Sequence, residues 1–488
     1  MKDLNKNKDI IIYLIFSILF AITIQQFTFY KGNSLHLLHA IKDLEINKLE
    51  KDWIANQTNH LPLFTYFNKI ILNIFSLNFL HIIHFILLSS CALFLFLICK
   101  YIFQNLNKIS LSLLWFSLFI FIYHEHSFFG GVAGQDVINE GYQPASYGVL
   151  FFIGIYLYLV KKNYYAIFFI CLSASIHPSY VLHSGFLIIG ILSYFIYQKD
   201  YKQSLKILAL YSILILPITI YVIYNFLLLD NSIIIKGQNI LLERIPHHAS
   251  IENWFSYKDI MSIFVYLVSI VLIYKNKRIF IPLAVFGSIS ILLSLIQFFT
   301  EINSLALTFP WRTSVFLMPL SIMIITSYLL QKLLTNKFNL NFLSIFIFLF
   351  IWSFFLINNH FVKDANKDFY KKLELTKKIN KNYNLIERIL IPVNLPYIRM
   401  NTGLPIFVDW KHHAFRYDEI INWKIRMDLA KNFYSSNDYK EQKINLRRII
   451  KTENISHILI KKENLKNDCK NLINHDIYAL INVKECYF

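Results

Sequence analysis

The chain has 488 residues, of which 56% are hydrophobic and 17% aromatic, and its mean hydropathy is +0.46. Soluble domains are less apolar, at about 45–50% on a similar count. The formal charge of +18 does not indicate nucleic-acid binding here, because lysines in the loops of a membrane protein face anionic lipid. We therefore expect an α-helical polytopic membrane protein that contacts membrane lipids and no nucleic acid.

Long apolar runs recur from Ile10 to Ile357, and many reach the roughly 20 residues that cross a hydrocarbon core of about 30 Å as a helix. The run at 70–99 is longer than a span requires and is expected to begin as an interfacial helix. No small-residue cleavage site follows the first run, which we interpret as a retained span. The sequence predicts eleven transmembrane helices, at 10–30, 70–99, 109–123, 144–160, 163–177, 179–197, 207–229, 259–274, 279–299, 313–330 and 340–358.

The loops between these runs alternate in charge. One set, which includes "MKDLNKNKD", "QKDYKQSLK", "KNKR" and "QKLLTNK", carries fifteen Lys and Arg residues, whereas "SIHPS" and "TEINSLALTFP" in the other set carry none. The positive-inside rule places the first set and the N-terminus in the cytoplasm. The first outer loop, 31–69, is an exception because it does carry lysines. We predict a transmembrane domain at 1–360 and an extracytoplasmic domain at 361–488, in the cytoplasmic membrane of a bacterium.

Chemically varied side chains gather on the expected outer side. In the first outer loop, "LHLLHAIKDLEI" predicts an amphipathic helix on the membrane surface, and "IHPS" predicts a tight hairpin in which Pro178 starts the next helix. Ionisable groups near membrane depth are costly and usually face a cavity, so we infer a polar cavity that opens outward. The candidate residues are Asp52, His124, Glu125, His126, Asp136, Glu140, His177 and Arg312.

From about residue 361 the composition becomes that of a soluble domain. "LIERILIPVN", "PIFVDWKHH", "ISHILIKK" and "DIYALINVK" predict strands, and "DANKDFYKKLELTKKINKN" and "YDEIINWKIRMDLAKNFYSS" predict helices, which together suggest a small α/β domain. Asp409, Lys411 and His412 follow a predicted strand, where open α/β sheets bind ligands; packing against the membrane part is an equal alternative. Cys469 and Cys486 can form a disulfide if the tail lies in an oxidising compartment.

The motifs "KDW", "IHPS", "FPWR" and "TGLPIFVDWKHH", in this layout of spans and outer domain, resemble a poorly characterised bacterial branch of the GT-C superfamily of membrane glycosyltransferases. The resemblance implies transfer of a sugar from a polyprenyl-phosphate donor to a glycan, lipid or protein acceptor. It also implies an acid in the first outer loop as general base, for which Asp52 matches best. Many relatives carry two adjacent acids there, whereas Glu50 and Asp52 are separated by one residue.

The remaining candidates have roles that the same chemistry requires. Cations must stabilise the departing phosphate, and His177, Arg312, His124 and His126 are the candidates for donor binding. Glu125, Asp136 and Glu140 are expected to contact the acceptor or a divalent metal ion, whose use is optional because no complete metal motif is present.

Two other classes of function remain open from the sequence. A transporter or flippase for a lipid-linked saccharide would use the same outer cavity without breaking a bond. Such proteins often show internal repeats and midplane ionisable residues, and neither is evident here. A non-catalytic assembly protein would bind its partner through the tail, and deleting the tail would then abolish function while a change at Asp52 would not.

Overall fold

The computed structural model describes residues 2–25, 34–44, 47–124, 130–139, 141–333, 341–362, 367–436, 438–465 and 469–487. By their internal contacts they form two compact units. Unit 1 comprises Met1–Phe27, Leu77–Val222 and Leu242–Asp364, and unit 2 comprises Thr28–Ser76, Ile223–Leu241 and Ala365–Phe488. The last of these limits lies close to the predicted boundary at 360/361. The segments 28–76 and 223–241 are grouped with the C-terminal tail, which the sequence did not indicate.

Unit 1 is helical, and each of the eleven predicted runs overlaps one of its longer helices. Six helical stretches are long and apolar enough to cross a membrane: Phe79–Ile102, Pro178–Tyr197, Tyr201–Leu227, Lys277–Thr300, Asn303–Lys332 and Phe342–His360. These stretches support membrane association. The helices are α1 (Lys2–Ile24), α4 (Phe79–Ile102), α5 (Ile109–His124), α7 (Val149–Leu159), α8 (Asn163–Ile176), α9 (Val181–Tyr197), α10 (Tyr201–Val222), α14 (Tyr257–Ile273), α15 (Lys277–Thr300), α17 (Ser314–Leu333) and α18 (Asn341–Ile357).

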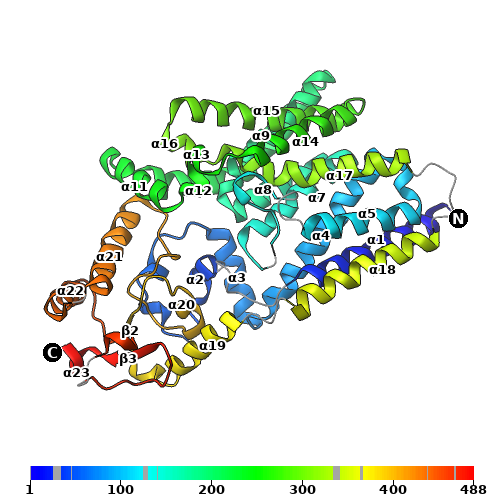
Figure 1. Ribbon diagram of the computed structural model, residues 1–488. Coiled ribbons are helices and arrows are strands. Elements are labelled where there is room, and N and C mark those ends of the chain that lie inside the picture. The colour runs from blue at the N-terminus through cyan, green and yellow to red at the C-terminus, as the bar shows by residue number, and fades with distance from the viewer. Residues whose placement is uncertain are drawn as a thin grey trace. The chain divides into compact units, whose positions relative to one another are not determined.

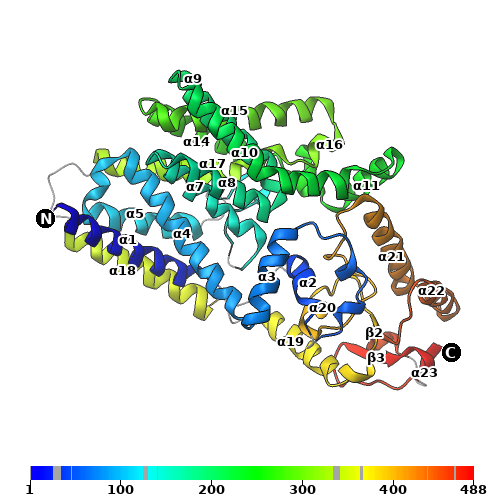
Figure 2. The ribbon, with the colours of Figure 1, turned by 180° about the vertical axis from the view of Figure 1, so that it is seen from behind.

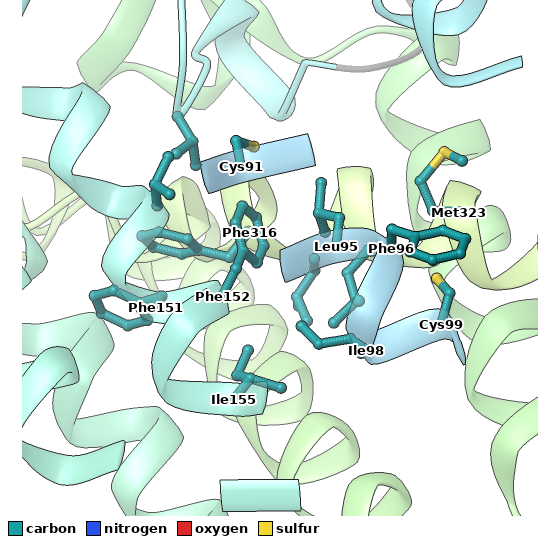
Figure 3. Packing of buried hydrophobic residues seen from close by; sticks show 14 of the residues in the cluster. Cys91, Leu95, Phe96, Ile98, Cys99, Phe151, Phe152, Ile155, Phe316 and Met323 are labelled. Atoms are coloured by element: carbon teal, nitrogen blue, oxygen red, sulfur yellow. The ribbon is translucent and has the colours of Figure 1, made fainter. Parts of the chain in front are cut away.

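Aromatic and small side chains pack these helices together. In the core formed by α4, α7 and α17, the Phe151 and Phe316 rings stack with centroids 4.2 Å apart (Figure 3). Helices α1, α4, α5 and α18 lie side by side (Figures 1 and 2). A methyl group at Gly190 of α9 would lie 2.5 Å from the Pro282 carbonyl oxygen of α15, so glycine is required for this close approach. Small residues allow helix backbones to approach in this way.

The structure divides the long run at 70–99 and confirms the "IHPS" hairpin. Helix α3 (Pro62–Ile74) ends before α4 begins at Phe79, so only Phe79–Ile102 is a candidate span. At the hairpin, α8 ends at Ile176, and Pro178 is the first residue of a 3₁₀ turn, Pro178–Tyr180, that runs into α9. Proline is tolerated at this position because the first amide groups of a helix have no partner within it.

Unit 2 contains a three-stranded sheet in the order β1 (Ile389–Leu390), β2 (His457–Lys461), β3 (Tyr478–Asn482). Strands β1 and β2 are parallel with Ile389 opposite His457, and β2 and β3 are antiparallel with Leu459 opposite Leu480. Unit 2 also contains the tail helices α19 (Lys367–Asn380), α20 (Tyr397–Thr402), α21 (Tyr417–Ser435), α22 (Tyr439–Thr452) and α23 (Val483–Tyr487), with α2 (Ser34–Ile41), α3 and most of α11 (Asn231–Arg244) from the other two segments.

The strand predicted within "PIFVDWKHH" is wrong. Only one bridge forms there, between Ile406 and Ile389. The Ile406 amide, on the side of the segment that faces away from β1, donates to the Asp52 carboxylate at 2.8 Å, so a side chain and not another strand pairs with this side. Three predicted strands are present, and the predicted helices at 367–380 and 417–435 are confirmed.

The amphipathic surface helix predicted in "LHLLHAIKDLEI" is also wrong in its environment. Helix α2 buries Leu35, Leu37, Leu38, Ala40 and Ile41, so its apolar side chains are covered by protein. Its neighbour α3 instead exposes apolar side chains, including Tyr66 and Ile74. Because α2 also buries His39, it packs as a core helix of unit 2.

Candidate functional site

The "FPWR" segment forms a fixed turn at the start of α17. Phe309 has a left-handed backbone (φ 52°), and Pro310 to Thr313 form a 3₁₀ turn. The Phe309 carbonyl accepts from the Arg312 amide at 2.8 Å and lies 3.2 Å from His183 Nε2 on α9. The Ser290 hydroxyl of α15 donates to the Pro310 carbonyl at 2.6 Å. Helices α9 and α15 therefore hold the turn that carries Arg312.

The "GGVAGQDVI" loop docks on the same turn. The Val132 amide donates to the Ser314 hydroxyl at 2.9 Å. A methyl group at Gly131 would lie 2.7 Å from Ser314 Oγ and from the Val315 amide nitrogen, so glycine is required for this contact. The buried side chain of Ile138 fixes the other end of the loop. The loop therefore presents Gln135 and Asp136, which lie between its two fixed ends.

Gln135 connects Arg312 to a histidine. Its side-chain oxygen accepts from Arg312 Nε at 2.5 Å, and its Nε2 lies 3.2 Å from His248 Nδ1. Arg312 forms no ion pair within the described residues, and its guanidinium lies 4.7 Å from the centre of the Phe309 ring. Within the part of the chain that the structure describes, neither terminal nitrogen of this half-buried guanidinium forms a hydrogen bond, so both can bind an anion. A planar guanidinium binds two oxygens of a phosphate or carboxylate at once.

Asp136 is the one described acid of this loop, and its ionisation is perturbed. Burial raises the pKa of its carboxyl to about 7, because desolvation disfavours the charged form. Within the described residues no cation pairs with it. Tyr180 interacts electrostatically with both Asp136 and Arg312, which places the acid and the cation in one neighbourhood. A buried carboxyl that titrates near neutral pH in the neighbourhood of a cation is typical of a functional site.

An apolar cavity of about 250 Å³ adjoins the Arg312 turn. Trp311, the neighbour of Arg312, forms part of its wall, and the indole ring of Trp254 lies 5.0 Å away between ring centroids. Both indole N–H groups are buried without a hydrogen-bond partner among the described residues. Phe255 and Phe298 at the rim are about half exposed. The cavity can therefore accept an apolar chain.

The structure brings some predicted donor-binding residues together and places others apart. His177 is half-buried, with its ring centroid 4.6 Å from that of Tyr180, and so lies beside the Arg312 and Asp136 neighbourhood. His124 stacks on Phe355 with ring centroids 4.1 Å apart and contacts Asn359. Neither partner belongs to the Arg312 site.

The prediction of a divalent metal stays a prediction. Glu125, His126 and Glu140 lie outside the described residues. Among the residues that the structure does describe, no group of three or more His, Cys, Asp or Glu side chains is arranged to hold a metal ion.

Asp52 lies in unit 2, at the centre of a buried charge network. Its side chain is 0% exposed. Oδ1 accepts from the amides of Ile54 and Ala55 at 3.0 and 3.1 Å, and Oδ2 accepts from Arg399 Nε at 2.9 Å and from the Ile406 amide. With four donors on its two oxygens and no exposed surface, the carboxylate is positioned to join the first loop to the tail. This geometry does not favour proton transfer to a substrate.

Asp409 and His412 belong to the same network. The Arg399 guanidinium also donates to Asp409, whose carboxylate contacts His412 Nδ1 at 2.8 Å. Burial alone would raise the pKa of Asp409, but Arg399 and His412 beside it lower the pKa to about 2. The third tail candidate, Lys411, is exposed and donates its amide to Asp409. Asp409 and His412 are thus held in a buried network within unit 2. Ligand binding and packing against the membrane part both stay predictions for this segment.

Two residues of the candidate site, Gln135 and Trp254, were not among the residues predicted from the sequence. Gln135 directly precedes Asp136, and its polarity in an outer loop gave no sign of a partner 177 residues away. Trp254 lies in "IENW", which the sequence indicated only as a loop. The sequence could have indicated Trp254 in one way: it and Trp311 lie in two loops that were both predicted on the outer side.

Comparison with known proteins adds no assignment to this geometry: no family model matches the chain, and no curated protein is similar to it.

Proposed function

We propose that this chain is a membrane glycosyltransferase that moves a sugar from a polyprenyl-phosphate donor to an acceptor on the extracytoplasmic face of a bacterial cytoplasmic membrane. The eleven helices of unit 1 would cross the membrane with the N-terminus in the cytoplasm and residues 361–488 outside. The observation that carries the proposal is the position of Arg312, whose terminal nitrogens form no hydrogen bond within the described residues, next to an apolar cavity. A lipid phosphate needs both surfaces.

Each part of the donor has a counterpart at this site. The two terminal nitrogens of Arg312 would bind the phosphate, and the aromatic rings of Trp254 and Trp311 in the cavity wall would pack against the lipid chain. The cavity of about 250 Å³ is smaller than the ~300–1,000 Å³ of sites that enclose a drug-sized ligand. It would therefore hold the first part of the lipid chain, while the rest leaves past the exposed rim into the bilayer.

The transfer step assigns separate roles to Asp136 and Arg312. The acceptor hydroxyl oxygen attacks the anomeric carbon and its proton passes to the Asp136 carboxylate. The bond between the anomeric carbon and the phosphate oxygen breaks, and the electron pair leaves on the phosphate. Arg312 stabilises this developing charge. A base with a pKa near the working pH is efficient, so we move the role of general base from Asp52 to Asp136.

Release of polyprenyl phosphate by the purified full chain in lipid tests the proposal, with extracted polyprenyl-phosphate sugars and acceptor extract. We expect Asp136→Asn to lower the rate by about 10²–10⁴-fold and Arg312→Gln by about 10²–10³-fold. Glu301→Gln is the matched control, because Glu301 is an exposed carboxyl of unit 1 at the end of α15, and it should leave the rate unchanged. An unchanged rate in Asp136→Asn would remove it as the base.

The pH dependence gives a second check on Asp136. Because a general base must be deprotonated, kcat/KM should rise as the pH increases through about 7 and then level off. Asp136→Asn should lose this rise, whereas Glu301→Gln should keep it. A rise that persists in Asp136→Asn would assign the titrating group elsewhere.

A flippase would give a different result in the same vesicles. The lipid-linked sugar would cross the bilayer, and no polyprenyl phosphate would be released from it. Movement of intact donor without its cleavage, with a competent acceptor present, would contradict the proposed transfer and favour transport.

A further inference from the structure

A second site, shallow and open to its surroundings, lies in unit 1 at the helix ends that carry the lysine-rich loops. It has a volume of about 570 Å³ and is lined by Tyr101, Lys161, Tyr194, Gln198, Lys275, Asn276, Lys277 and Arg278. We refer to it as the basic groove. Four of its eight lining residues are cations and none is an acid. The groove therefore concentrates positive charge at one shallow site.

Among the described residues, the cations of the groove contact neutral groups and no acid. Arg278 donates to the Tyr158 carbonyl at 2.6 and 2.9 Å and to the Asn163 side-chain oxygen at 2.9 Å, which are neutral acceptors. Within the described residues neither Arg278 nor the three lysines form a salt bridge. The first amides of α15, a helix of 24 residues, begin at Lys277, and a helix N-terminus attracts anions.

The surroundings of the groove favour a lipid over a soluble anion. Tyrosines at the same helix ends are exposed, among them Tyr101 at 37%, Tyr197 at 58% and Tyr274 at 50%. Tyrosine is enriched where the hydrocarbon core meets the headgroups. Ile196 and Val271, on the helices that lead to the groove, are exposed at 51% and 65% and would contact acyl chains.

We infer that the basic groove binds the headgroup of an anionic phospholipid. The phosphate would lie among Lys161, Lys275 and Lys277 above the rigid Arg278, with the acyl chains against the exposed apolar faces of α9 and α14. Basic pockets between transmembrane helices are known to bind such headgroups. This site is separate from the Arg312 site, and its occupation does not depend on the proposed transfer reaction.

Native mass spectrometry of the full chain in detergent tests the inference with cardiolipin as the probe and phosphatidylcholine as the neutral reference. The groove variant Lys161→Gln/Lys275→Gln/Lys277→Gln should bind cardiolipin on the order of 100-fold more weakly, because each lysine near a phosphate contributes a factor of about five. Arg278 is left unchanged because its hydrogen bonds support the fold. A Lys-to-Arg triple variant, which keeps the charge, should restore binding and shows that the groove is intact.

The matched control is Lys199→Gln/Lys202→Gln/Lys206→Gln. It removes the same charge around the α9–α10 loop, from exposed lysines outside the groove. One lysine in each set, Lys161 and Lys199, has a left-handed backbone. Equal weakening in both triple variants would overturn the inference in favour of general attraction to the bilayer. Competition by inorganic pyrophosphate at concentrations similar to those of cardiolipin would overturn it in favour of a soluble phosphate.

Discussion

Replacement of Asp52 by asparagine distinguishes a structural carboxylate from a catalytic one. An asparagine keeps one acceptor oxygen but turns an NH₂ group toward donors. If it replaces Oδ2, this group meets Arg399 Nε at the 2.9 Å contact and the Ile406 amide at 2.8 Å. Arg399 is 1% exposed, so its charge would remain buried with Asp409 as its one carboxylate. Breaking a buried ion pair from one side costs about 3–5 kcal/mol.

Hydrogen exchange of the full chain measures this loss where it occurs. Peptides that cover residues 52–56 and 398–409 should exchange between about 100-fold and several thousand-fold faster in Asp52→Asn, because each 1.36 kcal/mol is a factor of ten. The control is Asp43→Asn in the same loop. Its ion pair with Lys69 leaves both side chains about 45% exposed, so it should cost between zero and about 1 kcal/mol.

The outcome also tests the assignment of the base. Protection that stays at the level of Asp43→Asn would refute the reasoning, because a buried carboxylate with four donors cannot be replaced without loss. If protection were retained while polyprenyl phosphate release was lost, Asp52 would be catalytic, as the resemblance to GT-C enzymes implies. Loss of protection at both sets of peptides supports its role as a link between the two segments.

Three further outcomes follow from other contacts. Gly131→Ala should destabilise unit 1 by about 1–3 kcal/mol through overpacking and lower the midpoint of thermal unfolding. Gly185→Ala is the control and should leave the midpoint unchanged, because its methyl group would lie 3.4 Å from the nearest neighbour. Equal midpoints in the two variants would refute the close contact at Gly131. Burial lowers the pKa of His39 to about 4. Its contribution to the stability of unit 2 is therefore present above the unfolded pKa of about 6.5 and is lost as the pH falls toward 4, by about 2 kcal/mol at pH 5. Hydrogen exchange should show that His39→Gln weakens the dependence of unit 2 stability on pH, and an unchanged dependence would assign it to other histidines. Cys469 and Cys486 are free thiols close enough to interact. Mild oxidation should join them in a disulfide, which the intact mass would show as a loss of two hydrogens and which should add about 3 kcal/mol of stability. Two separate thiols after oxidation would contradict their proximity.

Local patterns in the sequence were sufficient for the helices and for most of the tail. Apolar runs predicted where the helices of unit 1 lie, because a helix that is apolar along its whole length appears in the sequence as a long continuous apolar stretch. The face of α21 with Ile420, Trp423, Met427 and Ala430 was predicted from its period, and all four side chains are buried. The failures concern environment: the pattern of α2 does not say whether protein or lipid covers Leu37 and Leu38.

The candidate site depends on contacts that no local pattern contains. Asp52 and Arg399 are 347 residues apart, and either could have been exposed. The resemblance selected Asp52 by its place in the first loop, whereas its burial follows from packing against the tail. Similarly, the free terminal nitrogens of Arg312 follow from Gln135, a neutral side chain, being the partner of its Nε. Asp136 was one of three possible acids, and its perturbed pKa arises from burial within its loop.

Unit 2 is assembled from three segments that lie far apart in the sequence, and this affects when its contacts can form during synthesis. Its first segment leaves the ribosome early, and the partner of Asp52 is made 347 residues later. At about 5–20 residues per second, translation of that interval takes roughly 20–70 s. We expect the segment 28–76 to lack its native partners throughout this time, with its carboxylate hydrated and its apolar residues open to chaperones and proteases. A chain that stops before Arg399 would therefore keep its membrane helices and lose a domain that begins at residue 28.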